Sequence, residues 1–330
     1  MKKNLIALAV AGALIAPMTS QAETKVYGKI HLNYGSFESK TGGVVNEDNW
    51  QLNSFASRFG VKGSHDLDGG LKAVYKLEWE VDPLDDDTKA IVINNRNQYL
   101  GLKGGFGEAR VGTHDTPLKM AQGKFDQFND TRADLKHAGS MDGENRLSSM
   151  LLYLGKTGNV GYNLALIPGE GDGTTGGDGP ADTYSASVTY KTGPFDVGLA
   201  VDSYDDTGAA VDSSNSLTRL VGTYKIKGMQ FGLLVQNGVE KVAASTAEED
   251  WIGLSFGAKL GSSNKIKAQY IMVENNAATT KESTLMAVGF DHKFAKNTTG
   301  YVMYSSIEDE TSGTTGDEFN SLSVGMIVKF

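Results

Sequence analysis

The chain of 330 residues contains no cysteine, only six prolines, and fewer basic than acidic residues. Without cysteine there are no disulfides, no cysteine-ligated zinc and no thiol catalysis. Apart from a stretch near the start, no apolar run approaches the roughly 20 residues that a membrane-spanning helix needs. The excess of 40 acidic over 31 basic residues speaks against a nucleic-acid partner, because phosphates require a basic surface. Scarce proline and 41 glycines favour strands and turns over helices.

The first 22 residues have the layout of a signal peptide. Lys2 and Lys3 precede an apolar stretch from Leu5 to Pro17, and the segment ends in Ser20-Gln21-Ala22, a small-x-small cleavage site. The apolar stretch is too short to span a membrane as a helix. We therefore predict that residues 1–22 are removed on export, leaving a domain of residues 23–330. That mature chain has 29 basic and 40 acidic residues, a net charge of −11.

Apolar and polar residues alternate with a period of two from end to end. Segment 183–191, "TYSASVTYK", places Tyr184, Ala186, Val188 and Tyr190 on one face and small polar residues on the other. Segments 251–260 and 321–330 follow the same rule. Such alternation is typical of strands with one apolar and one polar side.

The connections between these strands are of two kinds, which take turns along the chain. Short turns are expected at 65–70, 103–107, 155–159, 191–195, 227–229, 261–264 and 295–299. Long polar loops are expected at 36–47, 82–89, 114–145, 168–182, 205–215, 238–248, 275–281 and 308–318. Seven turns and eight loops separate sixteen strands. This rhythm predicts an all-β fold, a 16-stranded antiparallel transmembrane β-barrel, with a soluble all-β protein as the competing interpretation.

A barrel of sixteen strands is too wide to be filled by its own side chains and keeps an aqueous lumen. Transport is then the default hypothesis. The 114–145 segment is far longer than a connection needs to be. It either projects outward or folds inward and narrows the lumen.

Four segments resemble the Gram-negative general porin family. They are "SRFGVKGSHDLDGGLKAVYKLE" (57–78), "YLGLKGGFGEARVGTHDTP" (99–117), "GKFDQFNDTRADLKHAGSMDGENR" (123–146) and "SLSVGMIVKF" (321–330). The resemblance implies a homotrimeric outer-membrane channel for passive diffusion of small hydrophilic solutes. It also implies that the third loop, 114–145, folds inward as a constriction loop.

By the same resemblance, basic residues on the barrel wall face carboxylates on the third loop. The wall residues are then Arg58, Arg96 and Arg146, with Lys62 on the polar face of the strand that carries Arg58. The loop candidates are Asp126, Asp130, Asp134 and Glu144. Facing charges of opposite sign would create a transverse field in the water column and set ion preference.

The chain departs from the family pattern at two positions where arginine is usual, which hold Thr113 and Leu152. Arg110, on the polar face with Glu108, is expected to compensate in part. The weaker basic wall, together with the net charge of −11, leads to a prediction of mild cation preference.

No enzyme activity, cofactor or metal site is expected. The five histidines show no metal-ligand spacing, and no Ser/His/Asp group stands out. The alternatives are a substrate-selective outer-membrane channel, an outer-membrane barrel enzyme and a soluble exported adhesin. A selective channel would be expected to show a ladder of aromatic or basic residues in its lumen.

Overall fold

The computed structural model describes residues 22–84, 93–169, 179–206, 213–243, 245–276, 281–311 and 316–330. Residues 1–21 of the predicted signal peptide lie outside this part of the chain. The strands are β1 (Ala22–Thr41), β2 (Val44–Ser54), β3 (Arg58–Asp66), β4 (Lys72–Val81), β5 (Ile93–Gly104), β6 (Gly107–Asp115), β7 (Arg146–Thr157), β8 (Val160–Ile167), β9 (Thr183–Thr192), β10 (Phe195–Asp206), β11 (Ser213–Ile226), β12 (Met229–Val242), β13 (Ser245–Leu260), β14 (Asn264–Asn275), β15 (Lys281–Ala295), β16 (Thr298–Thr311) and β17 (Glu318–Lys329). Helix α2 (Pro117–Ala121) lies between β6 and β7. Among the described residues, no helix is both long and apolar enough to cross a membrane.

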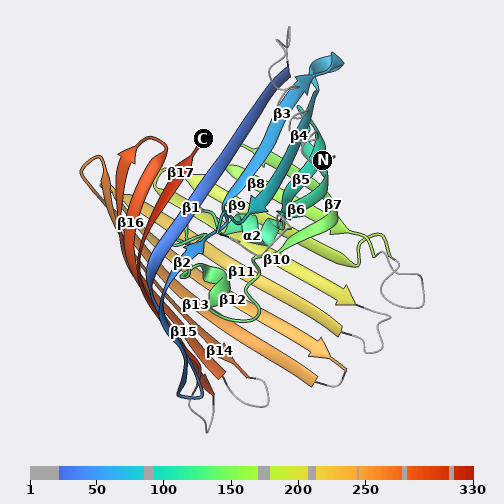
Figure 1. Cartoon of the computed structure of the whole chain (residues 1–330). Helices are drawn as coiled ribbons and strands as arrows, with labels where there is room; N and C mark the ends of the chain where they lie inside the picture. Colours follow the sequence, from blue (N-terminus) through green and yellow to red (C-terminus); the bar gives the residue numbers. More distant parts are fainter. Residues whose placement is uncertain are drawn as a thin grey trace, which may run out of the picture.

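The strands form one closed antiparallel barrel (Figure 1). From β3 to β17 each strand pairs with the next along the chain, and β1 closes the ring by pairing with β17 from Lys29 to Lys40. On its other edge, β1 pairs with β3 over its first half and with β2 over its second half. Strands β2 and β3 therefore share one position, and the barrel has the predicted sixteen.

The break between β2 and β3 leaves the neighbouring backbone paired. Ala56 adopts a left-handed conformation with φ of 49°. The Ser57 hydroxyl accepts a hydrogen bond from the backbone N–H of His31 at 3.0 Å, and the N–H of Phe55 donates to the His31 carbonyl. The strand therefore bends while the N–H and C=O of His31 on β1 keep their hydrogen-bond partners, as buried backbone groups require.

The seven predicted short turns all join consecutive strands in the structure. Two of the predicted long loops are wrong. At 36–47 the strands continue to Thr41 and resume at Val44, with Gly42 and Gly43 at positive φ in the turn. At 238–248 they continue to Val242 and resume at Ser245. The polar residues in these two segments belong to strand ends that extend beyond the apolar band. Exposed strand ends and loops have similar compositions, so composition alone does not distinguish them.

Alternation along the strands sorts side chains between the two faces of the wall, as predicted. On the outward face, large apolar side chains such as Leu254, Val188 and Leu322 are about half exposed. The inward neighbours Ser255, Ser187 and Ser321 are buried. The outward face is therefore the apolar one, the reverse of a water-soluble protein.

We expect Gly112→Ala to destabilise the barrel. Gly112 has φ of 136°, and an added Cβ would lie 2.2 Å from the carbonyl oxygen of Gln98 on β5. Backbone strain of this kind costs about 1–3 kcal/mol, which urea unfolding in lipid vesicles would measure. Gly105→Ala is the matched control, because a Cβ there meets nothing within 4 Å. Equal unfolding midpoints for the two variants would contradict the prediction.

Candidate functional site

The loop of residues 116–145 packs on the inner side of the wall formed by β11–β16. Phe125, Phe128 and Leu135 are fully buried and form one apolar cluster with the wall. The wall residues of that cluster are Val221, Leu234, Trp251, Ile271, Val273, Leu285, Ala287, Tyr301 and Met303. Each fully buried side chain of this size contributes about 1.5–3 kcal/mol. The loop and helix α2 lie inside the ring of strands (Figure 1).

Polar wall side chains also hold the loop backbone. The Glu249 carboxylate accepts hydrogen bonds from the N–H of Met141 at 2.9 Å and from Ser140. The buried Arg219 guanidinium donates to Glu144 at 2.8 Å and to the carbonyl of Asp142. Charge-assisted bonds in a buried setting are strong and directional. The loop is thus held at fixed points of β11 and β13.

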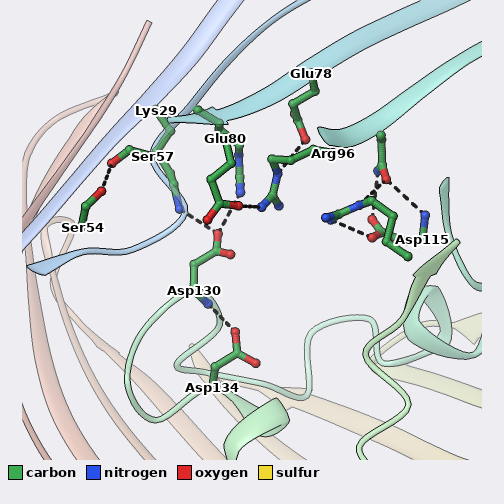
Figure 2. Close-up of polar contacts among 12 residues, drawn as sticks. Lys29, Ser54, Ser57, Glu78, Glu80, Arg96, Asp115, Asp130 and Asp134 are labelled. Carbon is green, nitrogen blue, oxygen red and sulfur yellow. Dashed lines mark hydrogen bonds and ion pairs between the residues drawn. The ribbon is translucent and has the colours of Figure 1, made fainter. Parts of the chain in front are cut away.

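On the far side of β17 from this wall, the loop contacts β1 and β3 through Asp130. One carboxylate oxygen of Asp130 lies 2.7 Å from Lys29 Nζ (Figure 2). The same oxygen lies 3.2 Å from Arg58 Nη1. Asp130 has a positive φ of 59°, which aspartate tolerates better than most residues. Its N–H donates to the Asp134 carboxylate at 2.7 Å, which fixes the bend.

A cavity of about 520 Å³ lies between the loop and the wall formed by β3–β7. Its lining is almost entirely polar and includes twelve ionisable side chains. Six are basic: Arg58, Lys76, Arg96, Lys119, Lys136 and Arg146. Six are acidic: Glu78, Glu80, Asp115, Asp130, Asp134 and Glu144.

On the wall side of the cavity, the basic residues are paired with carboxylates of the same wall. Arg96 donates to Glu78 at 3.1 Å and to Glu80 (Figure 2). Arg146 lies 2.8 Å from Asp115. The charges facing the water are therefore ion pairs rather than a row of free arginines.

Six of the nine residues singled out in the sequence line this cavity. They are Arg58, Arg96 and Arg146 from the wall and Asp130, Asp134 and Glu144 from the loop. Three do not. Lys62 lies over the ring of Tyr27, and Arg110 pairs with Glu108 at 2.7 Å and lies over the ring of Tyr99. The Asp126 carboxylate faces the loop interior, where it accepts hydrogen bonds from the N–H groups of Phe128 and Leu135.

Sequence reasoning did not single out the wall carboxylates Glu78, Glu80 and Asp115, or Lys29 at the loop contact. Glu78 and Glu80 are two residues apart on the face of β4 that also carries Lys76. Register places Arg58 directly opposite Glu80. This cross-strand pairing of opposite charges was the signal that could have identified Glu78 and Glu80.

The loop carboxylates differ in their ease of ionisation. Burial acts to raise the pKa of Asp130, but the charges of Lys29 and Arg58 outweigh it and hold the pKa at about 2. Burial raises the pKa of Glu144 to about 7 although Arg219 and Lys119 oppose the rise. Burial and the nearby Asp134 charge raise the pKa of Asp126 to about 8. Asp130 is therefore ionised at neutral pH, whereas the raised pKa of Glu144 lies close to neutral pH.

A family model described as Gram-negative porin matches residues 6–312 of the chain. The chain belongs to the Gram-negative porin family. Among curated proteins, this porin is 26% identical to outer membrane porin protein 32 of Delftia acidovorans, over 96% of this chain and 92% of the relative. It is 30% identical to the major outer membrane protein P.IB of Neisseria meningitidis, over 72% of this chain and 70% of the relative.

Solved structures agree with the porin fold. An anion-selective porin from Comamonas acidovorans superimposes with a TM-score of 0.80 at 21% identity, covering 94% of this chain and all of that one. In-vitro folded OmpT of Vibrio cholerae, in a trimer form, gives a TM-score of 0.73 at 18% identity, covering 94% of this chain and all of that one. The porin is thus an outer-membrane β-barrel, and its family and relatives point to a channel rather than an enzyme.

The two partners of the Arg58–Asp130 pair are expected to act on ion selectivity in opposite directions. Arg58→Ser removes a positive charge from the cavity and shifts the reversal potential in a KCl gradient towards cations. Asp130→Asn frees Lys29 and Arg58 and shifts it towards anions.

Asp250→Asn serves as the control for Asp130→Asn, because it makes the same charge change on the outward-facing side of β13. A shift of equal size in this control, or shifts of one sign in both pair variants, would contradict the prediction.

Proposed function

We propose that this porin forms a water-filled channel for passive diffusion of small hydrophilic solutes and ions, and that it assembles as a homotrimer. The observation that carries the proposal is the 520 Å³ cavity with its twelve ionisable side chains. A passage with so many charges favours hydrated, polar solutes and penalises apolar ones. Trimer assembly is supported by the trimer form among the structural neighbours.

The loop of residues 116–145 is the constriction in this proposal. It spans from the apolar cluster on β11–β16 to the Asp130 contact with β1 and β3. The open space beside it is the cavity against β3–β7. Solutes pass through that space, between Arg58, Arg96 and Arg146 on the wall and Asp130, Asp134 and Glu144 on the loop.

The mild cation preference expected from the net charge is not supported by the charges of the cavity. Six basic and six acidic groups line it, and wall arginines are matched by wall carboxylates. The structural neighbour from Comamonas acidovorans is described as anion-selective. We therefore propose weak selectivity near neutral pH, with a sign that depends on the protonation of the loop.

Purified porin in planar lipid bilayers is expected to give stepwise conductance increments in KCl. Diffusion through the channel slows as the solute becomes larger, so the rate of liposome swelling should fall steadily from small to larger neutral sugars. Absence of conductance steps from correctly folded protein would overturn the channel function. Swelling confined to one sugar would favour a substrate-selective channel.

Lowering the pH from 8 to 5 is expected to move selectivity towards anions, with a midpoint near 7. The pKa of Glu144 is raised to about 7, so Glu144 is charged above that pH and neutral below it. Its protonation leaves six basic groups against five acidic ones in the cavity.

Reversal potentials at several pH values would measure this shift. Glu144→Gln should abolish the component centred near pH 7. Asp250→Asn, which alters a carboxylate on the outward-facing side of β13, should leave that component in place. An unchanged pH profile in Glu144→Gln would assign the titration to another group.

A further inference from the structure

Exposed lysines lie at the end of the barrel that carries the short turns. Each odd-numbered strand from β5 to β17 has a lysine within its last three residues, before its short turn or the chain end, and β4 begins with one. We call these eight residues the lysine collar: Lys72, Lys103, Lys156, Lys191, Lys225, Lys259, Lys293 and Lys329. In outer-membrane barrels the short turns face the periplasm.

Strand register places the collar on the inner face of the wall. Lys329 lies opposite Lys29, which reaches the loop residue Asp130 inside the barrel. Lys225 lies opposite Gln230, whose side chain donates to the carbonyl of Lys124 in the same loop. Residues paired in register, and residues two apart on a strand, share a face. The same rule places the other six members on the inner face. Their register pairs are Lys72 with Lys103, Lys103 with Glu108, Lys156 with Gly161, Lys191 with Asp196, Lys259 with Lys265 and Lys293 with Thr299.

In the described part of the chain, carboxylates on the same face pair with three collar members and leave the other five without a partner of opposite charge. Lys72 pairs with Asp66, Lys103 with Glu108 and Lys191 with Asp196, whereas Asp291 pairs with Lys267, which is not a collar member. Among the described residues, five collar members have no carboxylate within 4 Å of the ammonium group. These are Lys156, Lys225, Lys259, Lys293 and Lys329, and all five are exposed. At this end the inner rim thus carries exposed positive charge on β7, β11, β13, β15 and β17.

Within the described structure, the fold gains ion pairs from three of the eight collar members and none from the other five. Lys72 faces Lys103, Lys259 faces Lys265, and Lys329 faces Lys29 directly across neighbouring strands. Like charges in such positions destabilise a sheet. Lipid headgroups do not explain the lysines either, because the collar faces the lumen. At the five positions without an ion pair, neutral polar residues would serve the barrel as well, so the positive charge there points to a ligand in the lumen.

We propose that the lysine collar binds small polyvalent anions, those with several phosphate or carboxylate groups, at the periplasmic mouth. Collar lysines on alternate strands are about 10 Å apart, two strand spacings. That distance is close to the Debye length of about 10 Å at 0.1 M salt, so neighbouring potentials overlap. The long flexible side chains let two or more ammonium groups meet one anion. A polyvalent anion bridges them, whereas chloride exchanges freely.

The inference rests on the proposed channel function. Its test uses tripolyphosphate as the probe in single-channel recordings at 0.1 M KCl. Tripolyphosphate added to one compartment should reduce the conductance at a concentration at least about tenfold lower than when added to the other. The block should weaken steeply as the salt is raised, because screening shortens the reach of the charges. The double variant Lys225→Gln with Lys259→Gln should raise the blocking concentration on the sensitive side about tenfold or more.

The matched control is Lys40→Gln with Lys241→Gln, two lysines near the ends of β1 and β12 at the opposite end of the barrel from the collar. It removes the same charge and should leave the one-sided block intact. Equal block from both sides, or a block untouched by the collar variant, would overturn the inference while the conductance steps still stand. Absence of conductance steps in the parent protein would instead overturn the channel function.

Discussion

A polypeptide that crosses lipid must pair every backbone N–H and C=O within itself, and a sheet meets that requirement only by closing. Closure here depends on the seam between β1 and β17, which is paired from Lys29 to Lys40. The chain end extends the seam, since Phe330 and Gly28 exchange both backbone hydrogen bonds. A Cβ at Gly28 would lie 2.2 Å from the Phe330 ring, so the glycine is what lets that ring lie against β1. The terminal phenylalanine and the glycine thus act together at the seam.

Closure at sixteen strands puts the apolar face outside and leaves a lumen that the wall cannot fill. The loop of residues 116–145 supplies the missing core, because Phe125, Phe128 and Leu135 turn part of the lumen into a packed interior. What stays open is the side against β3–β7, where the loop presents Asp130 and Asp134 instead of apolar residues. One segment therefore determines both the stability of the interior and the position of the passage. Arg219 and Glu249 couple the two, since they fix the loop backbone to the wall.

Alternation predicted the barrel, the strand count and the outward faces, because each depends on the period of the strand alone. It could not predict where the loop docks. Strand β15 is apolar on both faces around Leu285, Met286, Ala287 and Val288, since one face meets the outside and the other meets the loop. Such doubly apolar stretches were the available signal for the docking site. The wall carboxylates were missed for a different reason, because their pairing with Arg58 and Arg96 depends on register, which alternation does not determine.

The expectation of mild cation preference rested on the net charge, which contains no information on where the charged side chains lie. The chain carries a net charge of −9, yet the cavity holds six charges of each sign. Part of the acidic excess lies outside the lumen. Asp250, Glu274, Glu282 and Glu310 are successive register partners across β13–β16, in line with the outward residues Ile252, Met272 and Met286. The lysine collar lies on the opposite face, at the opposite end of the strands. An ion in the lumen responds to charges within about a Debye length, roughly 8–10 Å at physiological salt. It therefore meets the collar and the cavity, while the acidic row beyond the wall has little influence on its passage.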